Sequence, residues 1–346
     1  MRQCFLWVVL GSLLLGGCSS PPDQAYGPFL AEAYTRLAND YDALAARAGE
    51  QQVAVEAWCE GEGAALAQAR DAFSRTVLAW SRVEWLRLGP VADDHRYERL
   101  FYWPDRGLRG RRQVERYLAA PIDAPLDRES LANKSVAFQG LPALELVLYG
   151  GGARQANCAL ARPLVALISE LTTALATDWH AHETLASAIS VTDEPLSGAA
   201  AVAKTLSSAG AALEVLGEDQ IALPLGASPE AARPALAPFA LSSVQVAAMD
   251  AQVDALHTLF AGEFQALLPE AQRYQGAGVL RELQDIDSHL DVLASADTWQ
   301  GLLVDEAHRK RLTYLRQPLA SAAQGLSVGL TGALGLSAGF NATDGD

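Results

Sequence analysis

One carboxylate lies inside an otherwise apolar stretch of this chain. Glu145 falls within the run from Gln139 to Leu148, whose leucines, alanine and valine are typical of a buried helix. A buried carboxylate costs free energy unless it is paired, protonated or bound to a metal ion. We therefore expect Glu145 to meet a partner, either an arginine of the 82–116 stretch in a structural salt bridge or a ligand in a polar pocket.

The histidine motifs of zinc hydrolases are incomplete in this sequence. His182-Glu183 is followed by Ala186 where the second histidine of His-Glu-x-x-His would stand, and the reversed motif has Thr184 in that place. His180 and Glu183 lie at i, i+3 and could supply two metal ligands from one helix face, although exposed polar residues are the favoured explanation. No nucleophile elbow, phosphate-binding glycine loop or dinucleotide fingerprint is present in the sequence. A metallopeptidase is therefore the least supported activity.

Positive charge is concentrated in one part of an acidic protein. The 346 residues include 41 acidic and 26 basic side chains, a net charge of −15, which argues against nucleic acid as a partner. Between residues 82 and 116, however, nine arginines outnumber six carboxylates. These arginines either line a cationic cleft or lie on solvated helix faces and pair with acidic residues elsewhere.

Helical periodicity fills most of the chain, and strand signals are nearly absent. We predict an all-α fold of two helical-bundle halves, consistent with a duplication. The N-terminal bundle is expected over 29–190, a linker with a short helix over 191–241, and the C-terminal bundle over 242–346. Pro142 would kink its helix, unless the helix restarts with this residue in its first turn.

The N-terminal residues have the pattern of a lipoprotein. An apolar run ends in Leu15-Gly16-Gly17-Cys18, the small-residue motif that is cleaved before a lipid-bearing cysteine, and it is too short to span a bilayer. We expect residues 1–17 to be a signal peptide, Cys18 to carry the lipid, and 18–28 to be a tether. The membrane is then a partner through the anchor, an envelope protein is a further candidate partner, and the location is the periplasm-facing cell envelope. Ser19 after the cysteine, in place of Asp, favours the outer membrane.

Two cysteines remain once Cys4 has left with the signal peptide and Cys18 carries lipid. Cys59 and Cys158 form an even pair in an oxidising compartment, which predicts a disulfide between them. This bond would close a loop of about 100 residues and stabilise the fold by about 4 to 5 kcal/mol on the chain-entropy estimate.

Several separated segments of the chain form a set with a fixed order. They are Ala79-Trp80-Ser81-Arg82-Val83 with Leu88-Gly89-Pro90, then Tyr102-Trp103-Pro104-Asp105, then Gln139-Gly140-Leu141-Pro142-Ala143-Leu144-Glu145, and finally Gly339-Phe340-Asn341-Ala342-Thr343-Asp344-Gly345-Asp346. In this order, from residue 79 to the end, the chain resembles the imelysin-like family of bacterial envelope proteins. The combination is far more specific than any single segment.

The resemblance implies an all-helical fold of two bundle-like halves, a place in the cell envelope and a link to iron acquisition. The family's functional helix carries Gly-x-His-x-x-Glu, and here Gly140 and Glu145 match while Pro142 stands in place of the histidine. Imidazole is a good ligand for first-row metals and proline is none. The cofactor is therefore open, with iron or another divalent metal as the candidate and Glu145 as the best candidate ligand.

The leading hypothesis is a lipid-anchored, non-enzymatic binding protein of the imelysin-like type, linked to iron or metal uptake. The alternative is a structural or interaction lipoprotein that kept the fold and lost the metal site. The binding residues are expected to gather in one cleft, and they are Glu145, Gly140, Arg82, Glu84, His95 and Asp105.

Overall fold

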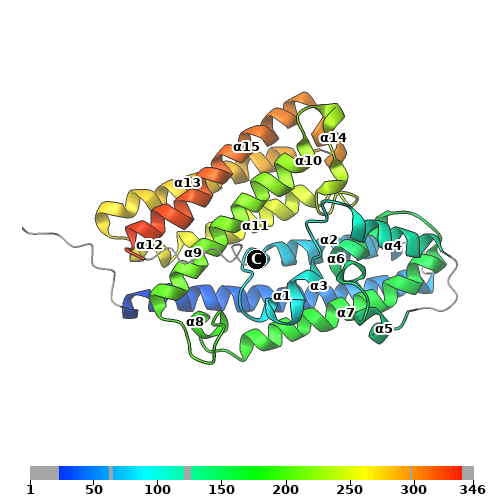
Figure 1. The fold of residues 1–346 in the computed structure, drawn as a ribbon, viewed down its shortest axis with the longest axis horizontal. Helices are drawn as coiled ribbons and strands as arrows, with labels where there is room; N and C mark the ends of the chain where they lie inside the picture. The colour runs from blue at the N-terminus through cyan, green and yellow to red at the C-terminus, as the bar shows by residue number, and fades with distance from the viewer. Residues whose placement is uncertain (1–22, 62–64, 121–125, 297, 337–346) are drawn as a thin grey trace, which may run out of the picture.

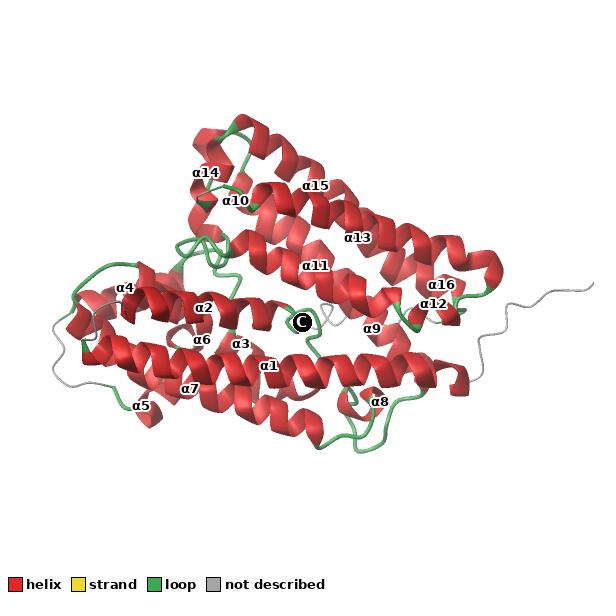
Figure 2. Ribbon diagram, turned by 180° about the vertical axis from the view of Figure 1, so that it is seen from behind, coloured by secondary structure: helices red, strands yellow, loops and turns green. Residues whose placement is uncertain are grey.

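The fold is entirely helical in the part of the chain that the structure describes. The computed structural model describes residues 23–61, 65–120, 126–296 and 298–336, in which every regular element is a helix and none is a strand (Figure 2). This confirms the all-α prediction. The expected signal peptide, Cys18 and the segment 339–346 lie outside the described residues.

The first bundle is built on three long helices. These are α1 (Gly27–Glu60), α2 (Ala65–Ser81) and α7 (Arg154–His180), and α1 lies against both of the others (Figure 1). The shorter α6 (Gly140–Tyr149) packs on α7 and α2. Further short helices complete this half: α3 (Arg96–Leu100), α4 (Arg109–Ala119), α5 (Arg128–Ala132) and α8 (Leu185–Ala188), with 3-10 turns at Gly89–Val91, Asp93–His95 and Val136–Phe138.

Helical structure starts inside the stretch expected as a tether. A 3-10 turn covers Asp23–Tyr26, and α1 begins at Gly27 with Pro28 in its first turn, where a missing amide hydrogen costs nothing. Tyr26 and Phe29 are both fully buried. The burial of these two aromatic side chains explains why the chain is already ordered before residue 29.

The second bundle contains four long helical segments. The first, α9 (Gly198–Val215), continues through a π-helix (Leu216–Ala222) into α10 (Leu223–Leu225), and it packs along α15 (Figure 1). The other three are α11 (Gln245–Ala261), α13 (Arg273–Leu293) and α15 (Glu306–Gln324). The smaller elements are α12 (Phe264–Leu267), α14 (Trp299–Val304), α16 (Thr331–Ala333), a π-helix at Gly325–Leu330 and 3-10 turns at Pro229–Ala231, Pro234–Leu236 and Glu270–Gln272.

The helix in the expected linker is longer than the sequence indicated. It runs without interruption from Gly198 to Leu225 and buries Val202, Leu206 and Leu213 within the second bundle. Pro224 lies near its C-terminal end, directly after the π-helix Leu216–Ala222, and the helix ends at Leu225. Most of the predicted linker is therefore a core element, and the irregular connection is confined to the residues after Leu225.

Two helices are long and apolar enough to cross a membrane by length and composition. They are Arg154–His180 and the segment Gly198–Leu225, of whose most apolar windows 56% and 50% are buried in the fold. Both pack against other helices of their own bundle. Their apolar character is that of helices in a protein core.

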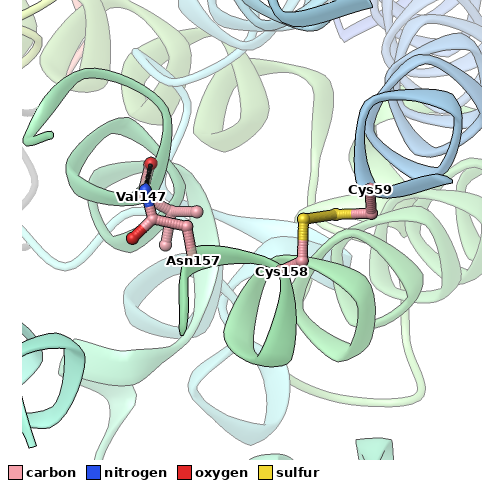
Figure 3. The surroundings of a disulfide bond; sticks show 4 residues. All are labelled: Cys59, Val147, Asn157 and Cys158. Atoms are coloured by element: carbon pink, nitrogen blue, oxygen red, sulfur yellow. Dashed lines mark hydrogen bonds between the residues drawn. A yellow bond between two sulfur atoms is a disulfide. The ribbon is translucent and has the colours of Figure 1, made fainter. Parts of the chain in front are cut away.

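A disulfide joins the end of α1 to the start of α7, as predicted. Cys59 and Cys158 are 99 residues apart in sequence, and their Cα atoms are 5.5 Å apart (Figure 3). Beside the disulfide, Asn157 Nδ2 donates to the carbonyl oxygens of Val147 and Gly151, each at 3.0 Å. The bond and the amide together hold the turn between α6 and α7.

Gly140 is required by close packing at the start of α6. Its φ is +76°, and a Cβ atom there would lie 2.2 Å from the carbonyl oxygen of Leu100. Gln139 before it is extended, and Pro142 occupies the first turn, where backbone amides have no acceptor within the helix. The helix therefore restarts at Gly140, and it is not kinked by the proline.

Replacing Gly140 should destabilise the protein through the backbone alone. Gly140→Ala puts a methyl group against the main chain of α3 at a positive φ, so we expect the free energy of unfolding to fall by about 3 kcal/mol. Urea denaturation followed by circular dichroism measures this. Gly49→Ala is the matched control, because a Cβ at Gly49 meets nothing within 4 Å and should stabilise α1 slightly. Equal effects of the two changes would contradict the packing role.

Reduction of the disulfide should lower stability without changing the fold. We expect Cys59→Ala with Cys158→Ala to reduce the free energy of unfolding by about 4 kcal/mol, because the unfolded chain regains the freedom that a long closed loop denies it. Denaturation of the double variant, and of the unaltered chain with and without reductant, gives the measurement. A reductant effect that persists in the double variant would show that the bond is not the cause.

Candidate functional site

Glu145 is a buried carboxylate held by the chain that leads into the second bundle. Its side chain is on α6, and the residue is 7% exposed. Oε1 accepts hydrogen bonds from the Leu241 amide at 3.1 Å, from the Ser242 amide at 2.8 Å and from the Ser242 hydroxyl at 2.7 Å. Among the described residues no hydrogen bond reaches Oε2. One oxygen is therefore fully engaged, and the other is left for the cavity beside it.

The protonation of Glu145 is set by opposing effects. Burial raises the pKa of this carboxyl above its ordinary value, and burial is the largest influence. The hydroxyl and amide of Ser242, the amide of Leu241 and the charge of Arg111 act in the opposite direction because they favour the ionised form. The desolvation prevails, so Glu145 binds a proton more readily than an exposed glutamate does.

The segment that donates these hydrogen bonds is fixed by aromatic packing. Phe239 has a φ of 54°, which is uncommon for a residue with a side chain, and its ring stacks on Phe101 with centroids 5.4 Å apart. Phe73 meets the same ring edge-on at 6.0 Å. Trp103 Nε1 donates to the carbonyl oxygen of Leu236 at 3.0 Å. Because the ring and the indole hold both ends of the turn, the amides of 241 and 242 point at Glu145.

A cavity of about 60 Å³ adjoins Glu145 at the junction of the two halves. Its walls come from the segment 102–111, from α6 and from the turn 235–240. Most of the wall is apolar or aromatic, and Pro142 forms part of it. The charged or hydroxylated groups on the wall are Tyr102, Asp105, Arg111 and Glu145.

Asp105 lines the same cavity and caps α4. Its Oδ1 accepts from the amide of Arg109 at 2.8 Å, and its Oδ2 accepts from the amide of Arg111 at 3.0 Å. A carboxylate at this end of a helix is stabilised by the free amides and by the helix dipole. Asp105 therefore positions α4, and both of its oxygens are already engaged.

The direct partner of Glu145 is not an arginine. Arg111 lines the cavity and acts on Glu145 through its charge, but its Nε donates to Glu115 at 2.7 Å. The expected salt bridge is replaced by main-chain amides and one hydroxyl from residues 241 and 242. Backbone amides carry no signature in a sequence, so this partnership could not be read from residue types.

Arg82 lies away from Glu145, at a different contact between the bundles. Its guanidinium donates to Asp40 on α1 at 3.0 Å and to Asp254 on α11 at 2.7 Å. It lines a separate cavity of about 150 Å³ between these helices. Arg82 thus pairs with acidic residues elsewhere in the chain, which was one of the two alternatives for the arginine-rich stretch.

Glu84 is buried in a third polar contact between the halves. Burial raises its pKa to about 7, although the charge of Arg87 and a hydrogen bond with Gln220 act in the opposite direction. Gln220 belongs to the π-helix and accepts from Gln245 Nε2 at 2.7 Å. Glu84 Oε2 is buried without a hydrogen bond among the described residues. No sequence pattern indicated Gln220 or Gln245, since single glutamines on helices are common.

His95 is on the surface. Its side chain is 87% exposed, and its Nδ1 lies 4.0 Å from Glu98 Oε2. The predicted gathering is therefore wrong for three of its members. Glu145 and Asp105 line the same cavity, and Gly140 is the first residue of the helix that carries Glu145. Arg82, Glu84 and His95 lie elsewhere, because each has its own contacts near a different helix end.

The histidine pair does not build a metal site either. His180 Nε2 lies 3.0 Å from both carboxylate oxygens of Asp42, in an exposed contact. Nowhere in the described ranges do three or more His, Cys, Asp or Glu side chains come close enough to hold a metal ion. The donor set at the Glu145 cavity is two carboxylates, which does not fit a dedicated transition-metal centre with three or more protein ligands.

The all-helical fold agrees with the comparison with known proteins. The imelysin family model matches residues 36–325, most of the chain. The chain belongs to the imelysin family. A crystal structure of an imelysin-like protein from Psychrobacter arcticum 273-4 is similar with a TM-score of 0.76, 20% identity and coverage of 92% of this chain and 98% of that one. At this identity the similarity shows the fold alone. No curated protein matches the chain.

Glu84 should make the stability of this imelysin-family protein depend on pH. With a pKa raised to about 7 in the folded state and near 4.5 when unfolded, its contribution is present below pH 4.5 and is lost as pH rises through 7. The glutamine of Glu84→Gln has no charge to bury. At pH 8.5 we therefore expect the free energy of unfolding of this variant to be about 3 kcal/mol higher than that of the parent, and near pH 4.5 we expect the two values to be equal.

Chemical denaturation across this pH range measures the difference between the two proteins. Glu183→Gln is the control because its carboxylate is on the surface, and it should follow the parent at each pH. A constant difference between Glu84→Gln and the parent from pH 4.5 to 8.5 would show that Glu84 does not titrate within the fold.

Proposed function

We propose that this imelysin-family protein is a lipid-anchored envelope protein that binds a small ligand without catalysing a reaction. The proposed ligand site is the Glu145 cavity. One observation supports this above the others: Oε1 of Glu145 is fixed by three hydrogen bonds, while Oε2 is left unbonded beside a cavity at the junction of the two bundles. A carboxylate fixed in this way is already oriented for a ligand, so little ordering is needed on binding.

The composition of the cavity favours binding over hydrolysis. The residues that line it include no histidine, cysteine or serine, the usual nucleophiles and bases of peptidases. Its walls are largely apolar, with a few polar groups that converge on one place, which is typical of binding sites for small ligands. The peptidase designation of the family therefore finds no support in this site.

Iron or another divalent cation is the cargo that the family link to metal uptake favours. Carboxylate oxygens suit hard cations, and Glu145 Oε2, which accepts no hydrogen bond among the described residues, would provide one. Pro142 contributes no ligand where the family motif has histidine. We therefore propose weak, exchangeable binding in which water completes the coordination, as a carrier requires, in place of a permanent metal centre.

A second candidate is a structural or interaction lipoprotein without a ligand. The observation in its favour is that Glu145 already accepts three hydrogen bonds from residues 241 and 242, so the carboxylate can stabilise the contact between the bundles. Pro142 agrees with this alternative as well. In both cases the proposed anchor is Cys18, and the proposed location is the periplasm-facing envelope, with the outer membrane favoured by Ser19.

Titration of two variants separates the candidates. We expect the mature chain with Cys18→Ser to release or absorb heat on addition of Fe(II), Fe(III) or Zn(II). Glu145→Gln should lower the affinity for the metal ion by at least tenfold, because a neutral amide replaces the charged ligand. Ser242→Ala is the matched control, since it removes only a donor to Oε1 and should keep most of the affinity.

Isothermal titration calorimetry gives the affinities, and thermal unfolding of each variant shows whether it is folded. Identical heats from Glu145→Gln and the parent would remove Glu145 from the site. No heat from any protein, together with equal destabilisation by both variants, would favour the structural candidate.

A further inference from the structure

The helix α4 presents an arginine face to solvent. Arg109, Arg112 and Arg116 are spaced i, i+3 and i+7, which places them on one side of a helix. All three residues are exposed. The opposite side of α4 is anchored by Val114 and Gly110, both buried, so the helix cannot turn this face inward. We refer to the three residues as the α4 arginine face.

In the part of the chain that the structure describes, no carboxylate pairs with this face. Arg112 donates to the carbonyl oxygen of Gly107 at 2.7 Å, and Arg116 donates to that of Arg112 at 3.1 Å, so these contacts are with neutral groups. Within the described ranges none of the three forms an ion pair with a carboxylate. The one acidic residue on α4, Glu115, pairs with Arg111.

Other arginines of the 82–116 stretch behave differently. Arg82, Arg96 and Arg106 form ion pairs with aspartates of distant helices. Arg87 lies over the ring of Tyr97, with 4.5 Å to its centroid. Among the described residues, α4 thus carries three neighbouring positive charges without a carboxylate partner, on a protein whose net charge is −15.

We propose that the α4 arginine face binds the surface of a bilayer that contains anionic phospholipids. Guanidinium groups bind phosphate in a bidentate manner and are well suited to phospholipid headgroups. A headgroup layer needs only charge on the protein side. None of the large exposed hydrophobic side chains of the described residues lies on α4, so this helix offers charge without an apolar centre.

The position of α4 gives this contact a structural consequence. The described chain begins at one end of α1, and α4 lies at the opposite end of the first bundle (Figure 1). α1 has 34 residues, about 50 Å at 1.5 Å per residue. With the lipid anchor of the proposed function, two contacts would hold the bundle lengthwise along the membrane. That orientation rests on the proposed anchor, whereas the binding of α4 to lipid does not.

Vesicle sedimentation tests the binding without the anchor. The protein is the mature chain with Cys18→Ser, which keeps every described contact because these lie within residues 23–336. The vesicles contain phosphatidylcholine alone or with 30% phosphatidylglycerol. We expect the protein to partition onto the anionic vesicles at low salt and to be released near 0.5 M salt, where exposed charges are screened.

The variant is Arg109→Gln with Arg112→Gln and Arg116→Gln. Each arginine near an anionic surface raises the partition coefficient about fivefold, so the triple change should weaken binding to anionic vesicles by about a hundredfold. Arg162→Gln with Arg273→Gln and Arg281→Gln is the matched control, because it removes the same charge from exposed positions elsewhere. Circular dichroism of both triple variants shows whether they are folded.

Three results would overturn the proposal. They are equal binding to both kinds of vesicle, an equal loss of binding in both triple variants, and preferential binding to soluble polyglutamate, which would identify an acidic polypeptide as the partner of this face. Because the protein in these measurements carries no lipid and the assay contains no metal ion, the outcome is independent of the Glu145 site and of the anchor.

Discussion

The structure depends on how the buried carboxylate of Glu145 is satisfied. A charged oxygen removed from water must recover hydrogen bonds from the protein, and here they come from the amides of Leu241 and Ser242, almost one hundred residues further along the chain. These donors exist only if α6 and the turn before α11 are held together. The carboxylate therefore links the two bundles, and the cavity beside it is located at this link.

Other contacts at the junction are polar as well. Arg82, directly after α2, donates to Asp254 of α11, and the amide of Glu263 donates to Glu32 of α1 at 2.8 Å. Glu84 adjoins Gln220 of the π-helix. Polar contacts exchange with water and ligands at lower cost than a packed apolar core does. Apolar contacts cross the junction too, such as Phe29 of α1 against Phe260 of α11, so its polar contacts are the part that a proton or a ligand can influence.

Much of the fold was predictable because helical periodicity and covalent constraints are local. The spacing of Phe29, Leu37 and Leu44 indicates α1, whereas Pro142 left a kink and a new helix start as alternatives. The pairing of Cys59 with Cys158 followed from elimination of the other cysteines. The predicted cleft was less accurate. Residues near matched motifs, such as His95, were assigned to it by sequence proximity, and proximity in sequence does not specify which end of a helix faces the cavity.

The sequence alone determined that this protein is helical, that Glu145 would lie within an apolar helix, and that α4 would be rich in arginine, because these properties follow from residue type and spacing. Only the tertiary structure decided what meets each group. The partners of Glu145 are main-chain amides, whose positions depend on the packing of Phe239 against Phe73 and Phe101. Such contacts join residues far apart in the chain, and every residue has an amide, so residue types do not reveal them.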